Sequence, residues 1–531
     1  MSAQYTLLDW FVFASYGAIL LLSGWWFNRK RANSSKDFFL GGNSMPTWMV
    51  AISVLATSQS AATFIGGPDQ GYQGDLSYLA TNIGAFIAAF IVSIFLIPKF
   101  YQQKVYTVYE LLEKRIGPKA KRRSGLMYLF GRVFASGARL YMAAIAVAMI
   151  LYGNINADSV IIATLLLALA GLLYTVFGGI RSVIYSDVLQ SVVYVSAAIA
   201  VIWCLLTLIP ADLSTILATL NEPTPGADSK LAIFKFDLDF GPSGVFNMAS
   251  VLTGFVLLNI AAFGLDQDMT QRLLTCKSEK EGSKALLLSI VMVIPVMLVF
   301  IFIGLLLYIV YQQPALMNSE GAQVVQEFNG EKITIFMYYV LNEAPAGVKG
   351  LVSVGIIAAA ISTLNSGLSS MSSVIVQDLY RPYLAAKNKH VADNHFVKAG
   401  RVGMAVVSFA LAMMAIICYF WQQYSDMPLL KFALSVMVFS YSGLLGVYFT
   451  TLFTNRGSEG SVLAALIVGF MVTLLMQPYM IDWLFPASAE RFYLGFTWQL
   501  CIGTALSTLV CCLGKAQLAQ RGQTAVGAEQ A

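Results

Sequence analysis

Long apolar segments are the feature that most constrains what this chain can fold into. An α-helix needs about 20 consecutive apolar residues to cross a bilayer, and windows of that length recur along all 531 residues. The chain is 58% hydrophobic and 11% charged, with a mean hydropathy of +0.70, which excludes an ordinary soluble domain. We therefore expect an all-α polytopic membrane protein with about 13 transmembrane helices, at residues 7–27, 46–66, 76–98, 124–151, 157–178, 183–209, 246–266, 284–311, 348–374, 398–421, 427–453, 459–479 and 492–513.

The distribution of basic residues supports this count and gives an orientation. Most of the 33 Lys and Arg residues fall in every second loop, whereas "GGPDQGYQGD" has none and residues 312–346 have one lysine. Cytoplasmic loops are the ones that carry excess Lys and Arg. We therefore expect a multi-pass protein of the cell inner (plasma) membrane, with its N-terminus outside and a cytoplasmic tail at residues 514–531.

The composition also argues against several other classes of protein. The net charge of +5 lies in short loop clusters that set topology, so it does not indicate a nucleic-acid partner. The six cysteines lack metal-site spacing, and both histidines, His390 and His395, lie in one charged loop. No Ser/His/Asp, metal or nucleotide signature indicates an enzyme, and no obligate protein partner is evident. A transporter, a channel and a membrane sensor remain.

Two of the apolar segments are interrupted by polar or glycine-rich sequence. They are 46–66, with "VLATSQSAATFIGGP", and 246–266, with "LLNIAAFGLDQ", and they lie five segments apart. Many secondary transporters consist of inverted repeats that contain discontinuous helices at the bilayer midplane. We therefore expect a five-plus-five inverted-repeat core with two broken helices, at residues 46–209 and 246–453. An extra helix at 7–27 precedes this core, and C-terminal helices at 454–513 follow it.

The segment 348–374 offers an unusual number of oxygen atoms. Residues 362–373, "STLNSGLSSMSS", contain eight hydroxyl or amide side chains, and Ala359, Ser362, Thr363, Ser366 and Ser370 share one helical face. Small hydroxylated residues also let helices pack closely, which explains one or two serines better than eight. Converging hydroxyls and carbonyls suit a dehydrated sodium ion, whereas a proton needs a titratable group. The pattern therefore favours a sodium site that includes carbonyls from the break in 46–66.

Several spaced motifs, in this order, resemble the sodium/solute symporter family. They are "FFLGGNSMPTWMVAISVLAT" (38–57), "YTVYELLEKR" (106–115), "GGIRSVIYSDVLQ" (178–190), "LDQDMTQR" (265–272) and "VKGLVSVGIIAAAISTLNSGLSSMSSVIVQDLY" (348–380). The resemblance covers roughly residues 7–480, and the family includes bacterial sodium/galactose, sodium/proline and sodium/sialic acid transporters. It implies sodium-driven import by alternating access, with sodium as the coupling ion and no other cofactor or metal.

The resemblance also implies which residues bind sodium. The family holds its shared sodium between the break of the second segment and a Ser-Ser/Thr pair of the ninth, which correspond here to Ala56, Gln59, Ala359, Ser362 and Thr363. The first three would act through backbone carbonyls. Gln59 stands where the family usually has an apolar residue, so a role for its side chain is open as well.

A second sodium site is implied for members that couple to two ions. The family's aspartate corresponds to Asp187, and the hydroxyls beyond the Ser/Thr pair correspond to Asn365 and Ser366. The alternative for Asp187 is a structural ion pair with Arg181. A stoichiometry of one or two sodium ions is therefore open.

The substrate pocket resembles that of the sialic acid members more than that of the galactose members. The galactose-binding positions correspond to Asn82, Thr63, Ala262 and Val293, so most of their polar groups are lost or shortened. The residues implied to bind the solute are Ser58, Ser60, Thr63, Tyr78, Asn82, Arg139, Asn259 and Phe263.

Arg139 is the residue that most bears on the class of solute. An arginine inside a membrane span is costly and is therefore a functional candidate, and the resemblance to the sialic acid members implies that it binds a carboxylate. Its alternatives are a snorkelling or helix-pairing arginine, and Arg132 lies one heptad earlier.

These observations predict a sodium-coupled symporter, not an enzyme, in the lipid bilayer. The preferred solute is small and polar, either a sugar acid such as sialic acid or another carboxylate. A neutral sugar or polyol is the alternative. A channel or a membrane sensor is a more distant alternative.

Overall fold

The structure is a computed structural model that describes residues 5–28, 34–176, 178–224, 228–317, 327–328, 331–422, 429–485 and 491–515. The part of the predicted tail beyond residue 515 lies outside the described residues. The first half of the chain contains α1 (Leu7–Asn28), α2 (Ser35–Leu40), η1 (Gly41–Asn43), α3 (Thr47–Ser58), α4 (Ala61–Gln73), η2 (Leu76–Ala80), α5 (Thr81–Phe95), α6 (Ile97–Gln103), α7 (Glu110–Arg115), α8 (Pro118–Tyr152), α9 (Ala157–Thr175), α10 (Gly179–Leu208), α11 (Leu213–Asn221), η3 (Ser243–Phe246), α12 (Met248–Leu252), α13 (Gly254–Ile260) and η4 (Ala261–Leu265).

The second half is also helical, apart from one short ribbon. It contains α14 (Gln267–Leu273), α15 (Glu279–Gln312), α16 (Pro314–Met317), β1 (Glu327–Phe328), β2 (Glu331–Lys332), α17 (Ile335–Asn342), α18 (Val348–Val374), η5 (Ile375–Tyr380), α19 (Arg381–Ala386), α20 (Asp393–Gln422), α21 (Leu429–Phe453), α22 (Glu459–Leu475), α23 (Pro478–Leu484) and α24 (Phe496–Cys512). The strands β1 and β2 pair antiparallel over two residues each, an addition to the predicted all-α fold.

The predicted membrane character is confirmed by the lengths of the helices. Nine helices in the described residues are long and apolar enough to cross a membrane, or up to eleven if each of two bent pairs is one span. Two shorter apolar helices, Met437–Phe453 and Phe496–Cys512, fall within the last predicted segments. The count of about 13 stays a prediction.

Both predicted helix breaks are present. The chain leaves α3 at Gln59, whose φ of −91° and ψ of 101° are extended, and it re-enters a helix at Ala61. The second break follows the one-turn π-helix η4, at Asp266, with a φ of −85° and a ψ of 117°. Each break leaves carbonyl groups at a helix end without intrahelical partners.

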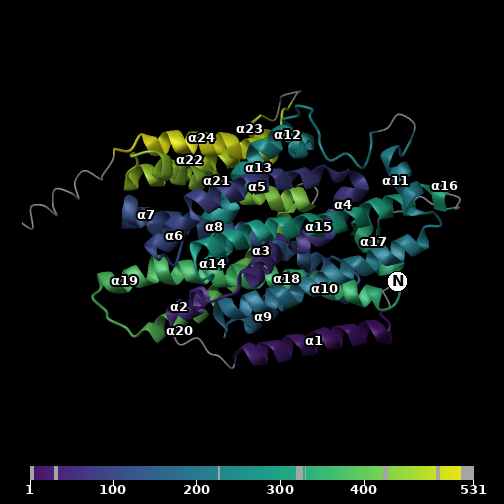
Figure 1. The fold of residues 1–531 in the computed structure, drawn as a ribbon, viewed down its shortest axis with the longest axis horizontal. Coiled ribbons are helices and arrows are strands. Elements are labelled where there is room, and N and C mark those ends of the chain that lie inside the picture. The colour runs from purple at the N-terminus through teal and green to yellow at the C-terminus, as the bar shows by residue number, and fades with distance from the viewer. Residues whose placement is uncertain are drawn as a thin grey trace, which may run out of the picture.

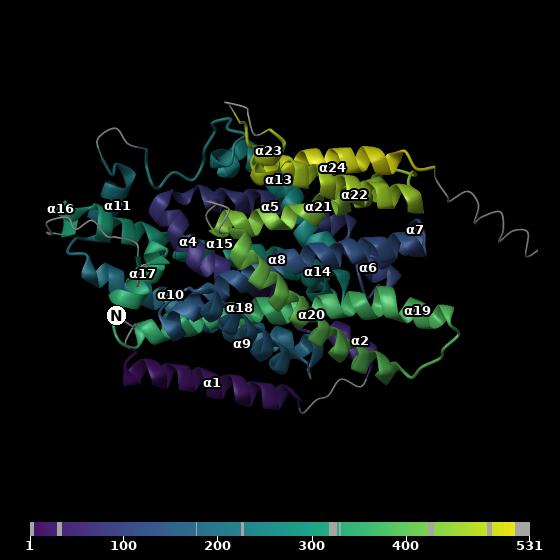
Figure 2. The ribbon, with the colours of Figure 1, turned by 180° about the vertical axis from the view of Figure 1, so that it is seen from behind.

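The helices run side by side along the long axis of the molecule. α1 lies along one edge, α22 and α24 lie along the opposite edge, and α3, α8, α14, α15 and α18 lie between them (Figures 1 and 2). The broken helices therefore lie in the interior of the bundle, where unpaired backbone groups can be tolerated in a membrane protein.

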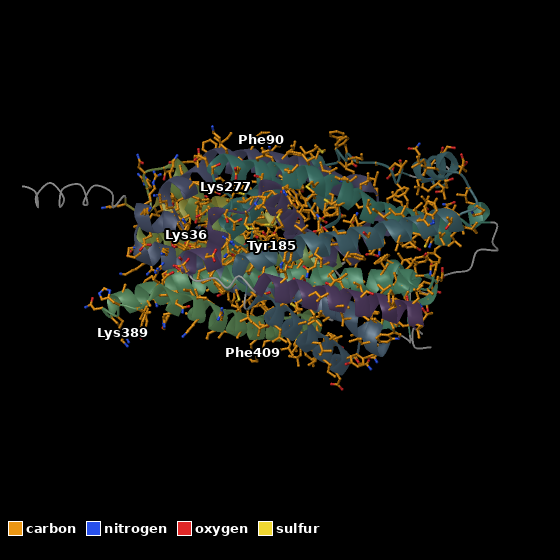
Figure 3. All side chains as sticks on the ribbon, turned by 60° about the horizontal axis from the view of Figure 1, so that its bottom comes forward. Lys36, Phe90, Tyr185, Lys277, Lys389 and Phe409 are labelled. Carbon is orange, nitrogen blue, oxygen red and sulfur yellow. The ribbon has the colours of Figure 1, made fainter. Side chains whose placement is uncertain are left out.

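The surface of the bundle has an apolar midsection and a basic end. Lys36, Lys277 and Lys389 lie toward one end of the bundle, whereas Phe90 and Phe409 project from its midsection (Figure 3). Phe90 and Phe409 are 55% and 67% exposed. This arrangement suits a bundle whose midsection contacts lipid and whose basic loops gather at one face of the membrane.

Candidate functional site

The break between α3 and α4 supplies the first group of oxygen atoms. Its sequence, "ATSQSA", is rich in serine and threonine, whose side chains compete for backbone hydrogen bonds. The Ser58 hydroxyl donates to the Leu55 carbonyl at 2.8 Å, in the last turn of α3. Because the helix ends here, the carbonyls of Ala56 and Gln59 are released in a buried setting.

Helix α18 supplies the second group. The Thr363 hydroxyl donates to the Ala359 carbonyl at 3.0 Å, and the Ser362 hydroxyl donates to Asp187 Oδ1 at 2.6 Å. Ala359, Ser362 and Thr363 are all buried, and α18 packs against α3. A hydroxyl that donates its proton keeps its lone pairs, so these oxygens can still accept a cation.

Asp187 lies at the centre of a buried polar cluster. Its carboxylate accepts hydrogen bonds from Ser53 at 2.5 Å and Ser362 at 2.6 Å, and it pairs with Arg272 at 3.3 Å. The alternative partner, Arg181, lies elsewhere: it pairs with Asp37 at 3.1 Å and donates to the Gly41 carbonyl at 3.0 Å. The Asp187–Arg181 pair that we considered from the sequence is therefore wrong.

The two other residues implied in a second sodium site point in different directions. The Ser366 hydroxyl donates to the Ser362 carbonyl at 2.7 Å and accepts a short hydrogen bond from Arg272, so it belongs to the Asp187 cluster. The Asn365 amide instead faces α9, with its nitrogen placed to donate to Thr175 Oγ1 at 2.7 Å and to the Gly171 carbonyl at 3.1 Å. The structure thus brings Ser366, but not the Asn365 side chain, to Asp187.

A chain of buried charges connects this cluster to α8. Asp268 pairs with Arg272 at 3.0 Å on one side and with Arg132 on the other, and Arg132 also reaches Asp266 at 2.8 Å. Together with Asp187, three carboxylates share two guanidinium groups, all of them buried. Among the groups in direct ion pairs, the carboxylates outnumber the guanidinium groups by one, and the guanidinium of Arg139 acts on Asp266 and Asp268 from a longer range.

A cavity of about 120 Å³ lies beside the helix breaks. It is lined by the α3–α4 break, by η2 and α5, and by α8, α13, η4, α14, α15 and α21. Six of the eight predicted substrate residues line it: Ser58, Tyr78, Asn82, Arg139, Asn259 and Phe263. Ser60 and Thr63 are buried in the chain just after the break and do not line this cavity.

Arg139 reaches this cavity without a carboxylate partner. Its Nη2 donates only to the Met437 sulfur, at 3.4 Å, and its Nη1 has no hydrogen-bond partner in the described part of the chain. The residue is 8% exposed, so it does not snorkel to the surface. Arg132, the other candidate, has its charge neutralised by Asp266 and Asp268.

Sequence reasoning missed several functional candidates. The cavity is also lined by Thr81, Phe255, Met269 and Met437, and no sequence signal marked them. Arg272 and Asp268 carried a signal, because charged residues inside apolar segments are functional candidates by default. Their pairing across the bundle was not visible in a linear pattern.

Two broken helices beside a cavity are the architecture of many secondary transporters. The chain belongs to the sodium:solute symporter family, whose model matches residues 38–469, and the resemblance seen in the motifs is confirmed.

The chain is similar to characterised relatives along most of its length. It is 26% identical to the sodium/sialic acid symporter SiaT of Proteus mirabilis (strain HI4320), over 88% of this chain and 89% of that protein. It is 28% identical to the sodium/glucose cotransporter of Vibrio parahaemolyticus, over 76% of this chain and 74% of that protein. Its fold matches a Na⁺-coupled sialic acid symporter solved in a substrate-bound outward-open state, with a TM-score of 0.77 and 23% identity over 96% and 98% of the two chains. The chain is therefore a sodium-coupled symporter with a multi-pass membrane fold.

Proposed function

We propose that this symporter imports a small solute that bears a carboxylate. It moves the solute across the membrane and does not convert it chemically. The observation behind the proposal is Arg139, a buried guanidinium that lines the cavity and has a donor without a partner. A buried charge left unpaired costs several kcal/mol. A carboxylate on the solute removes that cost through paired hydrogen bonds to the planar guanidinium.

The sodium ion is proposed to bind between the α3–α4 break and α18. The ligands would be the carbonyls of Ala56, Gln59 and Ala359 and the hydroxyls of Ser362 and Thr363. The Asp187 carboxylate supports this placement, because it accepts a hydrogen bond from the proposed ligand Ser362 and its negative charge favours a cation nearby in a low-dielectric interior. A second sodium ion at Asp187 and Ser366 is an extension of the same proposal.

The repeats and the orientation are part of the proposal as well. Residues 46–209 and 246–453 would be the two inverted repeats, since each begins with a broken helix. The protein would lie in the plasma membrane with its N-terminus outside, which agrees with the gathering of basic residues at one end of the bundle.

The names of the relatives support two classes of solute. The sodium/sialic acid symporter supports an acid, and the sodium/glucose cotransporter supports the alternative, a neutral sugar or polyol. Arg139 favours the acid, because a neutral sugar leaves the guanidinium charge uncompensated.

Uptake into proteoliposomes that contain the full chain tests this function. We expect an inward sodium gradient, but not a potassium gradient, to drive accumulation of radiolabelled carboxylates. The same assay with glucose and mannitol should show little uptake. Sodium-dependent uptake of the neutral solutes alone would replace the acid with the neutral alternative.

A further inference from the structure

The side chain of Gln59 is the second polar group that faces the cavity without a protein partner. Gln59 is 5% exposed and lines the cavity, and its Oε1 has no hydrogen-bond partner among the described residues. A buried polar atom left unsatisfied costs about 1–3 kcal/mol. Among the cavity's polar side chains it differs from Ser58, Thr81, Ser289 and Asn259, each of which donates to a nearby carbonyl.

Two unpartnered groups of opposite kind therefore line one small cavity. The Arg139 guanidinium offers donors and a positive charge, and the Gln59 amide offers an acceptor. A solute that satisfies both needs a carboxylate for Arg139 and a hydrogen-bond donor for Gln59. A hydroxyl group both donates and accepts, so it satisfies the amide in either orientation.

The size of the cavity limits the solute. Its volume is about 120 Å³, and an apolar cavity of about 150 Å³ in another protein holds one benzene molecule. A compact acid with a short carbon chain fits this space, whereas sialic acid is several times larger than benzene. Much of the remaining wall is apolar, from Phe255, Phe263, Met297 and Met437.

Amino acids are a second class of compact acid, and the charges that line the cavity exclude them. An amino acid carries an ammonium group next to its carboxylate, and a buried ammonium needs an anionic partner. No Asp or Glu is among the residues that line this cavity in the described part of the chain. The neutral Gln59 amide cannot balance that charge, but it can bind a hydroxyl group.

We infer that the solute is a short-chain hydroxycarboxylic acid, and that the Gln59 side chain selects for its hydroxyl group. The inference rests on the proposed function, since it assigns the solute carboxylate to Arg139. Gln59 then has two roles at the break. Its backbone carbonyl is a proposed sodium ligand, and its side-chain amide sets the specificity for the solute.

The test compares solutes that differ by one hydroxyl group. Sodium-driven uptake of radiolabelled D- and L-lactate, propionate, alanine and N-acetylneuraminic acid is measured in proteoliposomes with the full chain. We expect one lactate enantiomer to be preferred over propionate by at least about tenfold in the ratio of rate to half-saturating concentration, because propionate has no hydroxyl and its binding would leave the amide unpaired. Alanine and N-acetylneuraminic acid should be poor substrates.

The variant Gln59→Leu links this preference to one side chain. Leucine keeps the backbone carbonyl and a similar size but has no polar atoms, so the lactate preference should fall to within about twofold. The matched control is Thr164→Ala, which removes a buried hydroxyl outside the cavity that is bonded to the Val160 carbonyl at 2.8 Å. This control should keep the wild-type preference.

The outcomes separate this inference from the proposed function. Uptake of N-acetylneuraminic acid that needs Arg139, without uptake of lactate, overturns the inference and leaves the carboxylate function intact. Equal uptake of lactate and propionate, or an unchanged preference in Gln59→Leu, also overturns it. Uptake of glucose alone overturns both. The solute preference of the wild-type protein decides the matter even if Gln59→Leu does not fold.

Discussion

Arg272 of α14 and Asp187 of α10 form an ion pair of 3.3 Å in which both side chains are completely buried. The same carboxylate accepts a hydrogen bond from Ser362 of α18, a proposed sodium ligand. Through Asp268, Arg272 also connects to Arg132, which lies two helical turns before Arg139 on α8. One polar network thus reaches a proposed sodium ligand at one end and the helix that carries Arg139 at the other. Through such a network, sodium binding can change the free energy of the solute-binding state.

The first prediction concerns the charge at Asp187. Asp187→Asn should raise the sodium concentration for half-maximal uptake by about tenfold or more, because it removes a negative charge hydrogen-bonded to the proposed sodium ligand Ser362. Uptake of solute against sodium concentration measures the effect. If Asp187 holds a second ion, the Hill coefficient for sodium should also fall from near two towards one.

The control for this variant is Asp37→Asn, which removes the actual partner of Arg181. Asp37 and Arg181 are 31% and 39% exposed, and exposed ion pairs contribute little. The sodium dependence should therefore change by less than about twofold. An equal shift in both variants would argue against a sodium role for Asp187.

The second prediction concerns Ser362 and Thr363. Alanine at either position removes a proposed oxygen ligand, so the half-saturating sodium concentration should rise while the protein still inserts into the membrane. Ser372→Ala, on the same helix, removes a hydroxyl that donates to the Gly400 carbonyl at 2.6 Å and should leave sodium dependence unchanged. A Ser362→Ala/Thr363→Ala double variant with wild-type sodium dependence would contradict the assignment.

The third prediction concerns Asp268, which pairs with two buried guanidinium groups. Asp268→Asn should destabilise the fold by about 1–3 kcal/mol, because it weakens the charge-assisted hydrogen bonds to two buried guanidinium groups, which keep only Asp187 and Asp266 as carboxylate partners. Thermal unfolding of the purified protein in detergent measures this as a lowered melting temperature. Asp482→Asn, which breaks the exposed pair with Arg491, should change the melting temperature far less. Equal effects would mean that the buried network adds nothing to stability.

The fourth prediction concerns Arg139. Arg139→Lys keeps the charge but cannot bind a carboxylate with the paired geometry of a guanidinium. Uptake of carboxylates should therefore fall strongly, by about tenfold or more, while sodium binding, measured as sodium-dependent protection against thermal unfolding, persists. Normal carboxylate transport by this variant would remove Arg139 from the solute site.

The fifth prediction concerns the contact between α4 and α15. A side chain at Gly304 would overlap the Pro68 carbonyl, and one at Gly71 would overlap the Ile301 carbonyl. Gly304→Ala should therefore separate the two helices and lower the melting temperature clearly. Gly17→Ala, where nothing lies within 4 Å of the new methyl group, is the matched control. A similar melting temperature for both variants would show that the close approach is not required.

Much of the architecture could be predicted from the sequence, because its signals are local. Apolar length marked the spans, and the polar interruptions at "TSQS" and "GLDQ" marked the two broken helices, both of which the structure contains. The motifs identified the family, and six of the eight residues predicted to bind the solute line one cavity, although their role in binding stays a prediction. Ser60 and Thr63 do not line that cavity, because the turn at Gln59 decides which side chains of α4 face it.

The sequence by itself determined that this chain spans a membrane, where its helices break and which family it belongs to, since each depends on residue types and spacing along the chain. Only the tertiary structure decided how the charges are paired. Asp187 bonds to Arg272 and not to Arg181, and Asn365 faces α9, because helices far apart in sequence pack side by side. The two polar groups without partners, on Arg139 and Gln59, emerge in the same way. Whether a buried group is satisfied depends on every helix that surrounds it, and no linear pattern contains that information.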